Sequence, residues 1–251
     1  MTAYSKQLII FDLDGTLALS KSSIDTEMAD LLGKLIALKK VAVMSGGGYP
    51  QFETQLLRAL PHSADNFSNL LLMPTSGTKL YTWKGSWAEQ YSEHLTLKEK
   101  EKIMLALNWS LKQAGYVKPA QIYGDLIEDR GSQITFSALG QNAPLEAKIA
   151  WDTKRELRQK IAALLLEKIP EFDIRLGGTT SIDITKRGVN KGYGIRKLEE
   201  HLKIPLDNMV FVGDALYQGG NDYPAKATGV DCIQVSGPEE TKKLIASWIV
   251  S

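Results

Sequence analysis

The feature that most constrains this chain is a short apolar run near the N-terminus that ends in two carboxylates. Residues 8–11 (Leu-Ile-Ile-Phe) have strand character, and Asp12 and Asp14 follow them, one residue apart, at a Gly-Thr turn. Because the chain turns here, both carboxylates can reach one pocket at the carboxyl end of the strand. Buried together without a cation, they would repel each other, and at least one would hold a proton. The pattern therefore predicts a divalent metal site, in which a carboxylate can also act as a nucleophile toward phosphorus.

The composition is that of an ordinary soluble globular protein. The chain has 251 residues, of which 43% are hydrophobic and 24% are charged, which suits one large domain or two modest ones. Lys and Arg number 30 and Asp and Glu number 29, giving a formal net charge of +1. A chain without a bulk positive charge has no electrostatic field that favours nucleic acid, so we expect no nucleic-acid partner.

Cysteine usage and hydropathy favour a reducing, cytoplasmic location. The single cysteine, Cys232, cannot form an internal disulfide and lies in an apolar run, so we expect a buried, inert thiol. No apolar run approaches the ~20 residues that a membrane span requires, and the N-terminus lacks a signal-peptide pattern. We therefore expect no membrane association.

The two ends of the chain alternate strand and helix patterns. Apolar strands are expected at residues 8–11, 41–44, 70–73, 209–212 and 232–235, and helices at residues 25–38, 52–60, 192–202 and 239–248. This alternation predicts a Rossmann-like α/β core, with a parallel sheet covered by helices on both faces. Ligands of such sheets bind at the carboxyl ends of the strands, which is where Asp12 and Ser45 fall.

The middle of the chain has a different pattern. A strand or hairpin is expected at residues 78–83, further strands at residues 127–137, 172–176 and 181–185, and two helices that open with capping boxes at Thr96–Glu99 and Thr153–Glu156. The first of these helices runs to about residue 114, and the second ends at Pro170. The predicted architecture is a core formed by residues 1–82 and 188–251, interrupted by an inserted α+β cap formed by residues 83–187.

Three further elements fall at strand ends or helix starts in the predicted core. Ser45-Gly46 ends the second strand, where a hydroxyl and free N–H groups can hold a phosphate oxygen, although such a turn is common without any function. Lys191 precedes the first helix after the cap, where a lone lysine is usually solvated surface. An acidic, glycine-containing loop from Asp214 to Asp222, which includes Asn221, suits a hard cation such as Mg²⁺.

Taken in order, these motifs resemble those of the haloacid dehalogenase superfamily of phosphotransferases. The superfamily pattern is Asp-x-Asp-Gly-Thr, a Ser or Thr at a strand end, a lysine, and Gly-Asp followed by Asn-Asp. The matching residues here are Asp12, Asp14, Ser45, Lys191, Asp214, Asn221 and Asp222. The resemblance covers the whole chain, and the position of the cap is similar to that of the α/β-capped subclass, which holds sugar-phosphate phosphatases and eukaryotic-type phosphomannomutases. The phosphomannomutases are the family that the chain resembles most.

The resemblance implies a mechanism and a role for each motif. Asp12 would attack phosphorus to form an aspartyl-phosphate, and Asp14 would act as the general acid and base. Mg²⁺ would be held by Asp12, the backbone carbonyl of Asp14 and Asp214, with Asn221 and Asp222 completing its surroundings. Three residues would hold the phosphoryl oxygens (Ser45, Gly46, Lys191). In the cap, three residues would recognise a phosphorylated sugar (Arg130, Ser181, Asp183), and the cap is also where members of the family dimerise.

Departures from the mutase pattern decide between two reactions. Ser45 stands where the mutases carry glycine, and Tyr123 and Gln141 stand where two of the cap arginines belong. Those arginines hold the phosphate that does not react, and neither Tyr nor Gln replaces a bidentate, permanently charged guanidinium. We therefore expect a phosphatase, in which water resolves the aspartyl-phosphate. A phosphomannomutase that interconverts hexose 1- and 6-phosphates is the alternative, and an inactive phosphosugar-binding protein is a third reading.

Overall fold

The computed structural model describes residues 5–20, 22–61 and 66–249. The chain divides into two compact units, unit 1 with Met1–Ser92 and Val189–Ser251, and unit 2 with Glu93–Gly188. The second boundary lies within one residue of the expected one, whereas the first lies ten residues later. The difference arises because strand β5 (Trp87–Ser92) pairs with β4 (Lys79–Trp83) and so extends the sheet of unit 1.

Unit 1 contains a seven-stranded sheet in the order β11-β10-β1-β2-β3-β4-β5. The five parallel strands are β1 (Leu8–Asp12), β2 (Lys40–Met44), β3 (Leu70–Met73), β10 (Met209–Gly213) and β11 (Asp231–Gln234), and β4 and β5 form an antiparallel hairpin at one edge. All five residues of β1 are buried, as expected for a central strand covered on both faces. The parallel sheet predicted from the alternating pattern is confirmed.

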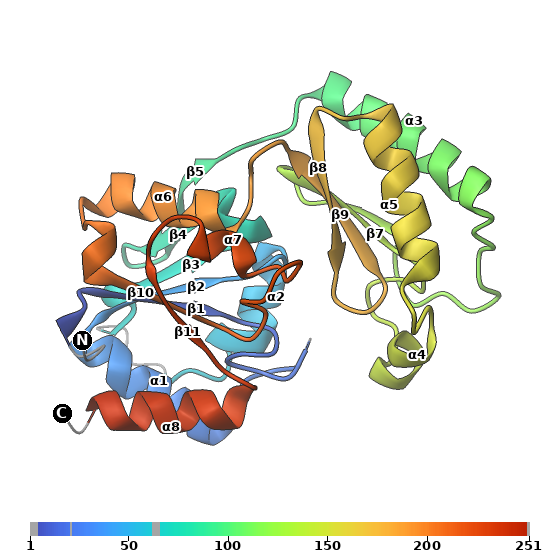
Figure 1. Ribbon diagram of the computed structural model, residues 1–251. Helices are drawn as coiled ribbons and strands as arrows, with labels where there is room; N and C mark the ends of the chain where they lie inside the picture. The colour runs from blue at the N-terminus through green and yellow to red at the C-terminus, as the bar shows by residue number, and fades with distance from the viewer. Residues whose placement is uncertain (1–4, 21, 62–65, 250–251) are drawn as a thin grey trace. The chain divides into compact units, whose positions relative to one another are not determined.

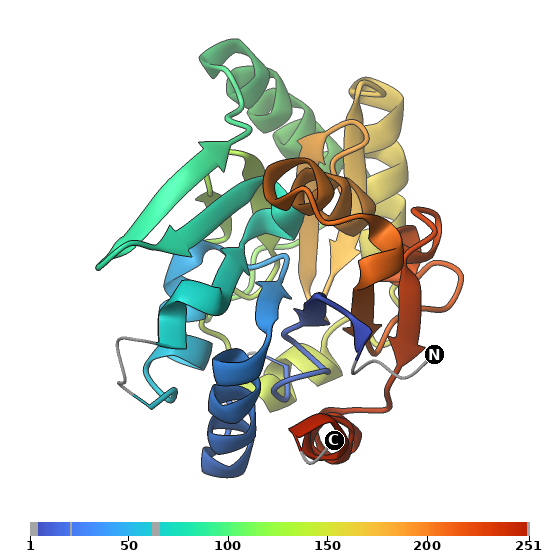
Figure 2. The same cartoon turned by 90° about the vertical axis from the view of Figure 1, so that its left-hand side faces the viewer.

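Helices cover both faces of this sheet. Ile9 and Phe11 point to the face covered by α1 (Thr26–Leu38) and α8 (Pro238–Ile249), which lie side by side in Figures 1 and 2. Leu8 and Ile10 point to the opposite face, where they share a core with α6 (Lys191–Leu202). Alternate strand residues point to opposite faces, so this short apolar run contributes to two cores and leaves only its end for polar chemistry.

Short elements complete unit 1. The helix expected at residues 52–60 begins earlier, as α2 (Tyr49–Phe52) with Pro50 in its first turn, and continues as a π-helical segment (Glu53–Leu57). Helix α7 (Tyr223–Lys226) follows the acidic loop, and 3₁₀ segments among the described residues include Asn66–Asn69, Thr75–Gly77 and Leu206–Asn208. Across the described part of the chain, no helix combines the length and the apolar character that a membrane crossing requires.

Unit 2 is built on a four-stranded antiparallel sheet in the order β6-β7-β9-β8. The strands are β6 (Ile127–Asp129), β7 (Gln133–Ser137), β8 (Phe172–Gly177) and β9 (Ser181–Lys186), and the helices are α3 (Leu97–Ala114), α4 (Leu145–Ala150) and α5 (Glu156–Lys168). The apolar residues of β7 and β9 pack with α3 and α5 in one core. Their intervening residues, such as Thr135 and Asp183, therefore lie on the opposite face of the sheet.

The prediction of a single strand at residues 127–137 is wrong, because the chain forms a hairpin there. Gly131 has a positive φ of 82°, and its N–H donates to the Asp129 carboxylate at 2.8 Å. An aspartate that accepts a hydrogen bond from the backbone two residues later is a turn signal, and it outweighs the apolar alternation on either side. The turn separates β6 from β7 and places Arg130 at its tip.

The capping box expected at Thr153–Glu156 is also wrong. Helix α5 begins at Glu156, and the preceding Arg155 has a positive φ of 60° and makes no side-chain cap. Asp152 takes the capping role instead, since its carboxylate accepts from the N–H groups of Leu157 and Arg158 and pairs with the buried Arg158 guanidinium. Helix α4 was not expected from the sequence at all.

The first capping box is confirmed. Thr96 accepts from the Glu99 N–H at 3.2 Å, and the Glu99 carboxylate accepts from the Thr96 N–H at 2.6 Å. Gly115 ends α3 in the left-handed conformation. These bonds pair two backbone N–H groups that would otherwise lack an acceptor at the N-terminal end of the helix, and so they fix where α3 starts.

Thr96→Ala should lower the free energy of unfolding by about 1 kcal/mol, because it removes the side-chain acceptor of this cap. Thr96→Ser keeps the hydroxyl and should change stability by less than about half as much. Urea unfolding followed by circular dichroism measures both. Equal losses in the two variants would show that the hydroxyl bond does not stabilise the helix.

Candidate active site

The carboxyl end of β1 holds the first residue of the site, Asp12. Its carboxylate is buried, and the Lys191 ammonium donates to its Oδ1 and also to Oδ1 of Asp222. Lys191 is the first residue of α6, whose start is fixed by Asn190, which accepts from the Tyr193 N–H at 3.0 Å. The lysine is therefore a buried member of the site and not solvated surface.

The loop after β10 supplies two more carboxylates. Asp222 is fully buried, and its Oδ2 accepts from the Ala215 N–H at 3.0 Å. Asp214 is half-buried, and the Thr16 hydroxyl donates to its Oδ1 at 3.4 Å. A Cβ at Gly15 would lie 2.6 Å from Oδ2 of Asp214, and Gly15 has a φ of +88°, so only glycine fits this turn.

The three carboxylates form a group suited to a cation. One oxygen each of Asp12, Asp214 and Asp222 lies within 4.8 Å of the others. Oδ2 of Asp12 is buried and has no hydrogen-bond partner in the described structure, which is costly for a carboxylate unless a ligand fills the place. Three carboxylates and the Lys191 ammonium leave two net negative charges, which one divalent cation would neutralise. The donor set is all oxygen, as hard cations require.

The electrostatics of the cluster match this reading. Burial raises the pKa of Asp12 and of Asp214 above the usual range of a carboxyl. The Asp222 charge adds to this rise, and the Lys191 charge opposes it without cancelling it. Burial lowers the pKa of Lys191, but the charges of Asp12 and Asp222 outweigh it and hold that pKa above its ordinary value. The lysine therefore stays charged, and the acids need a further positive charge to ionise together.

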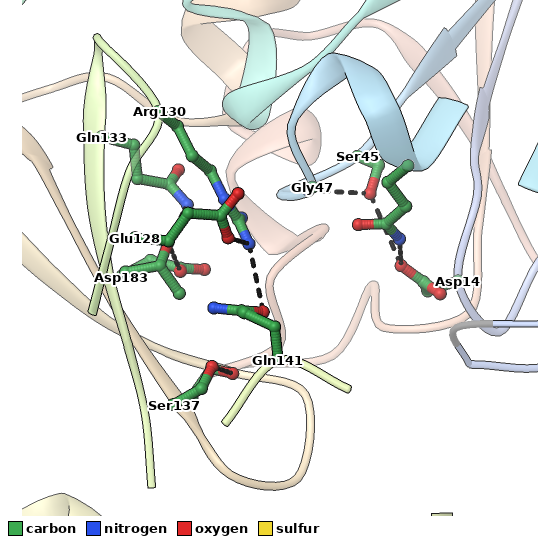
Figure 3. Close-up of polar contacts among 12 residues, drawn as sticks. Asp14, Ser45, Gly47, Glu128, Arg130, Gln133, Ser137, Gln141 and Asp183 are labelled. Atoms are coloured by element: carbon green, nitrogen blue, oxygen red, sulfur yellow. Dashed lines mark hydrogen bonds and ion pairs between the residues drawn. The ribbon is translucent and has the colours of Figure 1, made fainter. Parts of the chain in front are cut away.

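Asp14 belongs to a separate polar group of the same unit. Its Oδ2 accepts from the Gln51 amide at 2.8 Å and lies 3.5 Å from the Ser45 hydroxyl. The Ser45 oxygen in turn accepts from the Gly47 N–H at 3.1 Å, as Figure 3 shows. The two predicted carboxylates thus have different partners, Asp12 a lysine and Asp14 neutral donors, which suits them to different roles.

Three further residues of unit 1 were predicted to be phosphate-binding, metal-binding or buried: Gly46, Asn221 and Cys232. Gly46 lies half-buried in the turn after β2, next to Ser45. Asn221 is exposed, so its place in the metal surroundings stays a prediction. Cys232 is half-buried and not fully buried as expected, and burial raises the pKa of its thiol to about 11, in keeping with an inert group.

Sequence reasoning missed three polar residues of this site: Thr16, Gln51 and Gln55. Thr16 was within reach, because it is part of the Asp-x-Asp-Gly-Thr motif. Gln51 and Gln55 carry no signal in a single sequence, since glutamines four residues apart on a helix are common on solvated faces. Their role depends on where Asp14 lies, and only the folded chain shows that.

In unit 2, Ser181 and Asp183 lie on the polar face of β9. The Ser181 and Ser137 hydroxyls are 2.8 Å apart, and Oδ1 of Asp183 accepts from the Thr135 hydroxyl at 2.8 Å. These bonds fix both side chains on one face of the sheet, which agrees with a shared binding surface.

Arg130 lies at the tip of the β6–β7 hairpin. Its guanidinium pairs with Glu128 at 2.7 Å and lies 3.5 Å from Oε1 of Gln141 (Figure 3). Lys148 of α4, a cation that sequence reasoning missed, is buried and donates to the Gln141 carbonyl at 2.9 Å. The arginine that matches the mutase pattern is therefore already paired with a carboxylate.

Comparison with known proteins identifies relatives that align with nearly the whole chain. A family model described as eukaryotic phosphomannomutase matches residues 28–250. A probable phosphomannomutase of Caenorhabditis elegans is 27% identical over 249 residues, which cover 96% of this chain and 94% of that protein. The phosphomannomutase of Spinacia oleracea is also 27% identical, with 97% of this chain and 96% of that protein covered.

Solved structures share the fold. The N-terminally truncated, IMP-bound IMP-nucleotidase of Plasmodium falciparum superposes with a TM-score of 0.70 at 17% identity, over 98% of this chain and 69% of that one. The C-terminal domain of Candida albicans trehalose-6-phosphate phosphatase gives a TM-score of 0.64 at 14% identity, with 99% of this chain and 95% of that chain covered. The fold is that of a haloacid dehalogenase core with an inserted cap. Because the family model spans most of its length, the chain belongs to the eukaryotic phosphomannomutase family.

Proposed function

We propose that the protein is a Mg²⁺-dependent phosphotransferase that acts on sugar phosphates through an aspartyl-phosphate on Asp12. The observation that carries the proposal is the state of Asp12, a buried carboxylate with one oxygen on Lys191 and the other unpartnered within an acidic group. Lys191 already pairs with Asp12 and Asp222, so a structural ion pair gains nothing from the third carboxylate, Asp214. Phosphoryl transfer, in contrast, requires a nucleophile, a metal and a fixed cation at one place.

Each residue has a distinct role in the proposed reaction. Asp12 attacks phosphorus as the bond to the leaving alkoxide breaks, and Asp14 gives that alkoxide a proton. Asp14 then takes a proton from the incoming water or hydroxyl as the aspartyl-phosphate is resolved. Ser45, Gly46 and Lys191 hold the transferring phosphoryl oxygens. Asp12, the Asp14 backbone carbonyl and Asp214 would hold Mg²⁺, with Asn221 and Asp222 completing its surroundings, and the ion would supply positive charge against the charge that develops on those oxygens.

Water is the acceptor that we propose, which makes the protein a phosphatase. Ser45 supports this choice, because it stands where the mutases carry glycine. The ion pairs of two cap arginines support it as well. Arg130 is paired with Glu128, and Arg175 with Asp173, so a carboxylate already balances the positive charge of each guanidinium. A mutase must bind a second phosphate while the sugar turns over, and paired arginines bind an anion less strongly.

A phosphomannomutase is the second candidate. The family model and the relatives favour it, since the relatives named above are phosphomannomutases and align with nearly the whole chain. Recognition of the sugar by Arg130, Ser181 and Asp183, a cytoplasmic location and dimerisation through the cap remain predictions under either reaction.

Mg²⁺ should stabilise the folded protein, because it neutralises the buried acidic group. At a Mg²⁺ concentration 100 times the Kd, the free energy of unfolding should rise by about 2.7 kcal/mol. Asp214→Asn should weaken Mg²⁺ binding at least about tenfold in a calorimetric titration. The exposed Asp207 is the matched control, and Asp207→Asn should bind Mg²⁺ as the wild type does. A wild type with no heat of binding would contradict the metal assignment.

Asp12→Asn should lower kcat at least about a thousandfold, because an amide is not a nucleophile toward phosphorus. The variant should stay folded, since the amide carbonyl can still accept from Lys191, and circular dichroism checks this. Radiolabelled phosphosugar should label the wild type, in an acid-stable and hydroxylamine-sensitive form, and leave the variant unlabelled. Turnover near the wild-type rate in the variant would refute the mechanism.

A product assay separates the two candidate reactions. Purified protein with Mg²⁺ and mannose 1-phosphate, with and without a hexose 1,6-bisphosphate activator, is followed for free phosphate and for mannose 6-phosphate. We expect phosphate release that does not depend on the activator. Activator-dependent mannose 6-phosphate without phosphate release would instead identify a mutase, and neither product from any of a panel of phosphosugars would favour an inactive binding protein.

A further inference from the structure

Gln51 lies beside Asp14 in unit 1 and uses both hydrogens of its amide. Nε2 donates to Oδ2 of Asp14 at 2.8 Å and to Oε1 of Gln55 at 2.6 Å. Gln55 is only 4% exposed, so the second bond anchors Gln51 to the interior of the unit. The three side chains form a chain of hydrogen bonds that ends on the carboxylate.

The orientation of the Gln51 amide follows from its neighbours. Its NH₂ group faces Oδ2 of Asp14, and a carboxyl oxygen that carries no proton can only accept a hydrogen bond. The amide oxygen then lies against Gly47, where a Cβ would stand 1.7 Å from Oε1 of Gln51. Any other residue at position 47 would displace the glutamine, so the turn after β2 is shaped around this side chain.

The Gln51 bond is a stronger restraint on Asp14 than the Ser45 contact. The Ser45 hydroxyl lies 3.5 Å from the same Oδ2, at the limit of a hydrogen bond, whereas the amide lies at 2.8 Å. The proposed reaction also requires the Ser45 hydroxyl for the phosphoryl group. The glutamine is therefore better placed than Ser45 to orient the carboxylate throughout the reaction.

We propose that Gln51 is a positioning residue that orients the Asp14 carboxylate for proton transfer, with Gln55 holding Gln51 in place; the proposal rests on the proposed function. A carboxylate restrained at one oxygen presents the other in a fixed direction, which favours transfer of a proton to a leaving alkoxide. The effect should depend on the leaving group. An alkoxide needs a proton to leave, whereas p-nitrophenolate is stable without one.

The test compares the single-turnover rate of phosphoenzyme formation for an alkyl phosphate, glycerol 2-phosphate, with that for p-nitrophenyl phosphate, because the later resolution of the aspartyl-phosphate uses Asp14 with either substrate. Gln51→Leu keeps the approximate size and removes the donor, and we expect about a tenfold loss for the alkyl substrate and less than about twofold for the aryl substrate. Gln51→Glu keeps the shape but presents an acceptor to Asp14, and it should show the same selective loss. Gln55→Leu should show a smaller loss with the same selectivity.

The exposed Gln7 provides the matched control, and Gln7→Leu should leave both rates unchanged. Thermal unfolding of each variant detects a purely structural effect. If the wild type turns over both substrates and the Gln51 variants lose both equally, the positioning role is overturned and the proposed function stands. If the wild type turns over neither substrate and forms no phosphoenzyme, the proposed function fails and this inference fails with it.

Discussion

The placement of one buried ammonium between two buried carboxylates is the interaction on which the candidate site depends. Lys191 contacts Asp12 and Asp222, residues that are 179 and 31 positions away along the chain. Two ionised carboxylates buried together, Asp12 at the end of β1 and Asp222 in the loop after β10, would destabilise the fold, and the lysine offsets one of them. The parallel pairing of β1 with β10 brings the acids together, and the start of α6 supplies the cation. Fold and chemistry thus share the same contacts.

Much of this arrangement can be predicted from the sequence, because it depends on local patterns. The apolar runs predict the parallel strands, and the rule that sheet ligands gather at strand carboxyl ends predicts that Asp12, Asp214 and Asp222 meet there. Lys191 was the weakest of these predictions by itself, since nothing local distinguishes a buried lysine from a solvated one. The order of the motifs, and not the lysine's own surroundings, pointed to it.

The errors arise where a distant contact or a tight turn decides the structure. The hairpin at Gly131 interrupts an apolar alternation that continues on both sides, so the period alone predicts one strand. Asp152 caps α5 because Arg158 and the helix N–H groups converge on it, which no spacing rule anticipates. Gln51 and Lys148 acquire their partners only from the fold. The turn at Gly131 and the cap at Asp152 are local features that the apolar period does not reveal, whereas Gln51 and Lys148 depend on contacts made by the folded chain.

The insertion of unit 2 between β5 and α6 also sets an order for synthesis. Strand β1 pairs with β2 on one side and β10 on the other, and residues 93–188 are translated before β10. Until then the emerging chain carries an apolar central strand with one edge unpaired, a surface prone to wrong pairing. All four strands of unit 2, in contrast, lie within one uninterrupted segment of the sequence, residues 93–188. The inserted unit is therefore the first part of the chain able to complete its sheet on the ribosome, and the sheet that carries the carboxylates is the last.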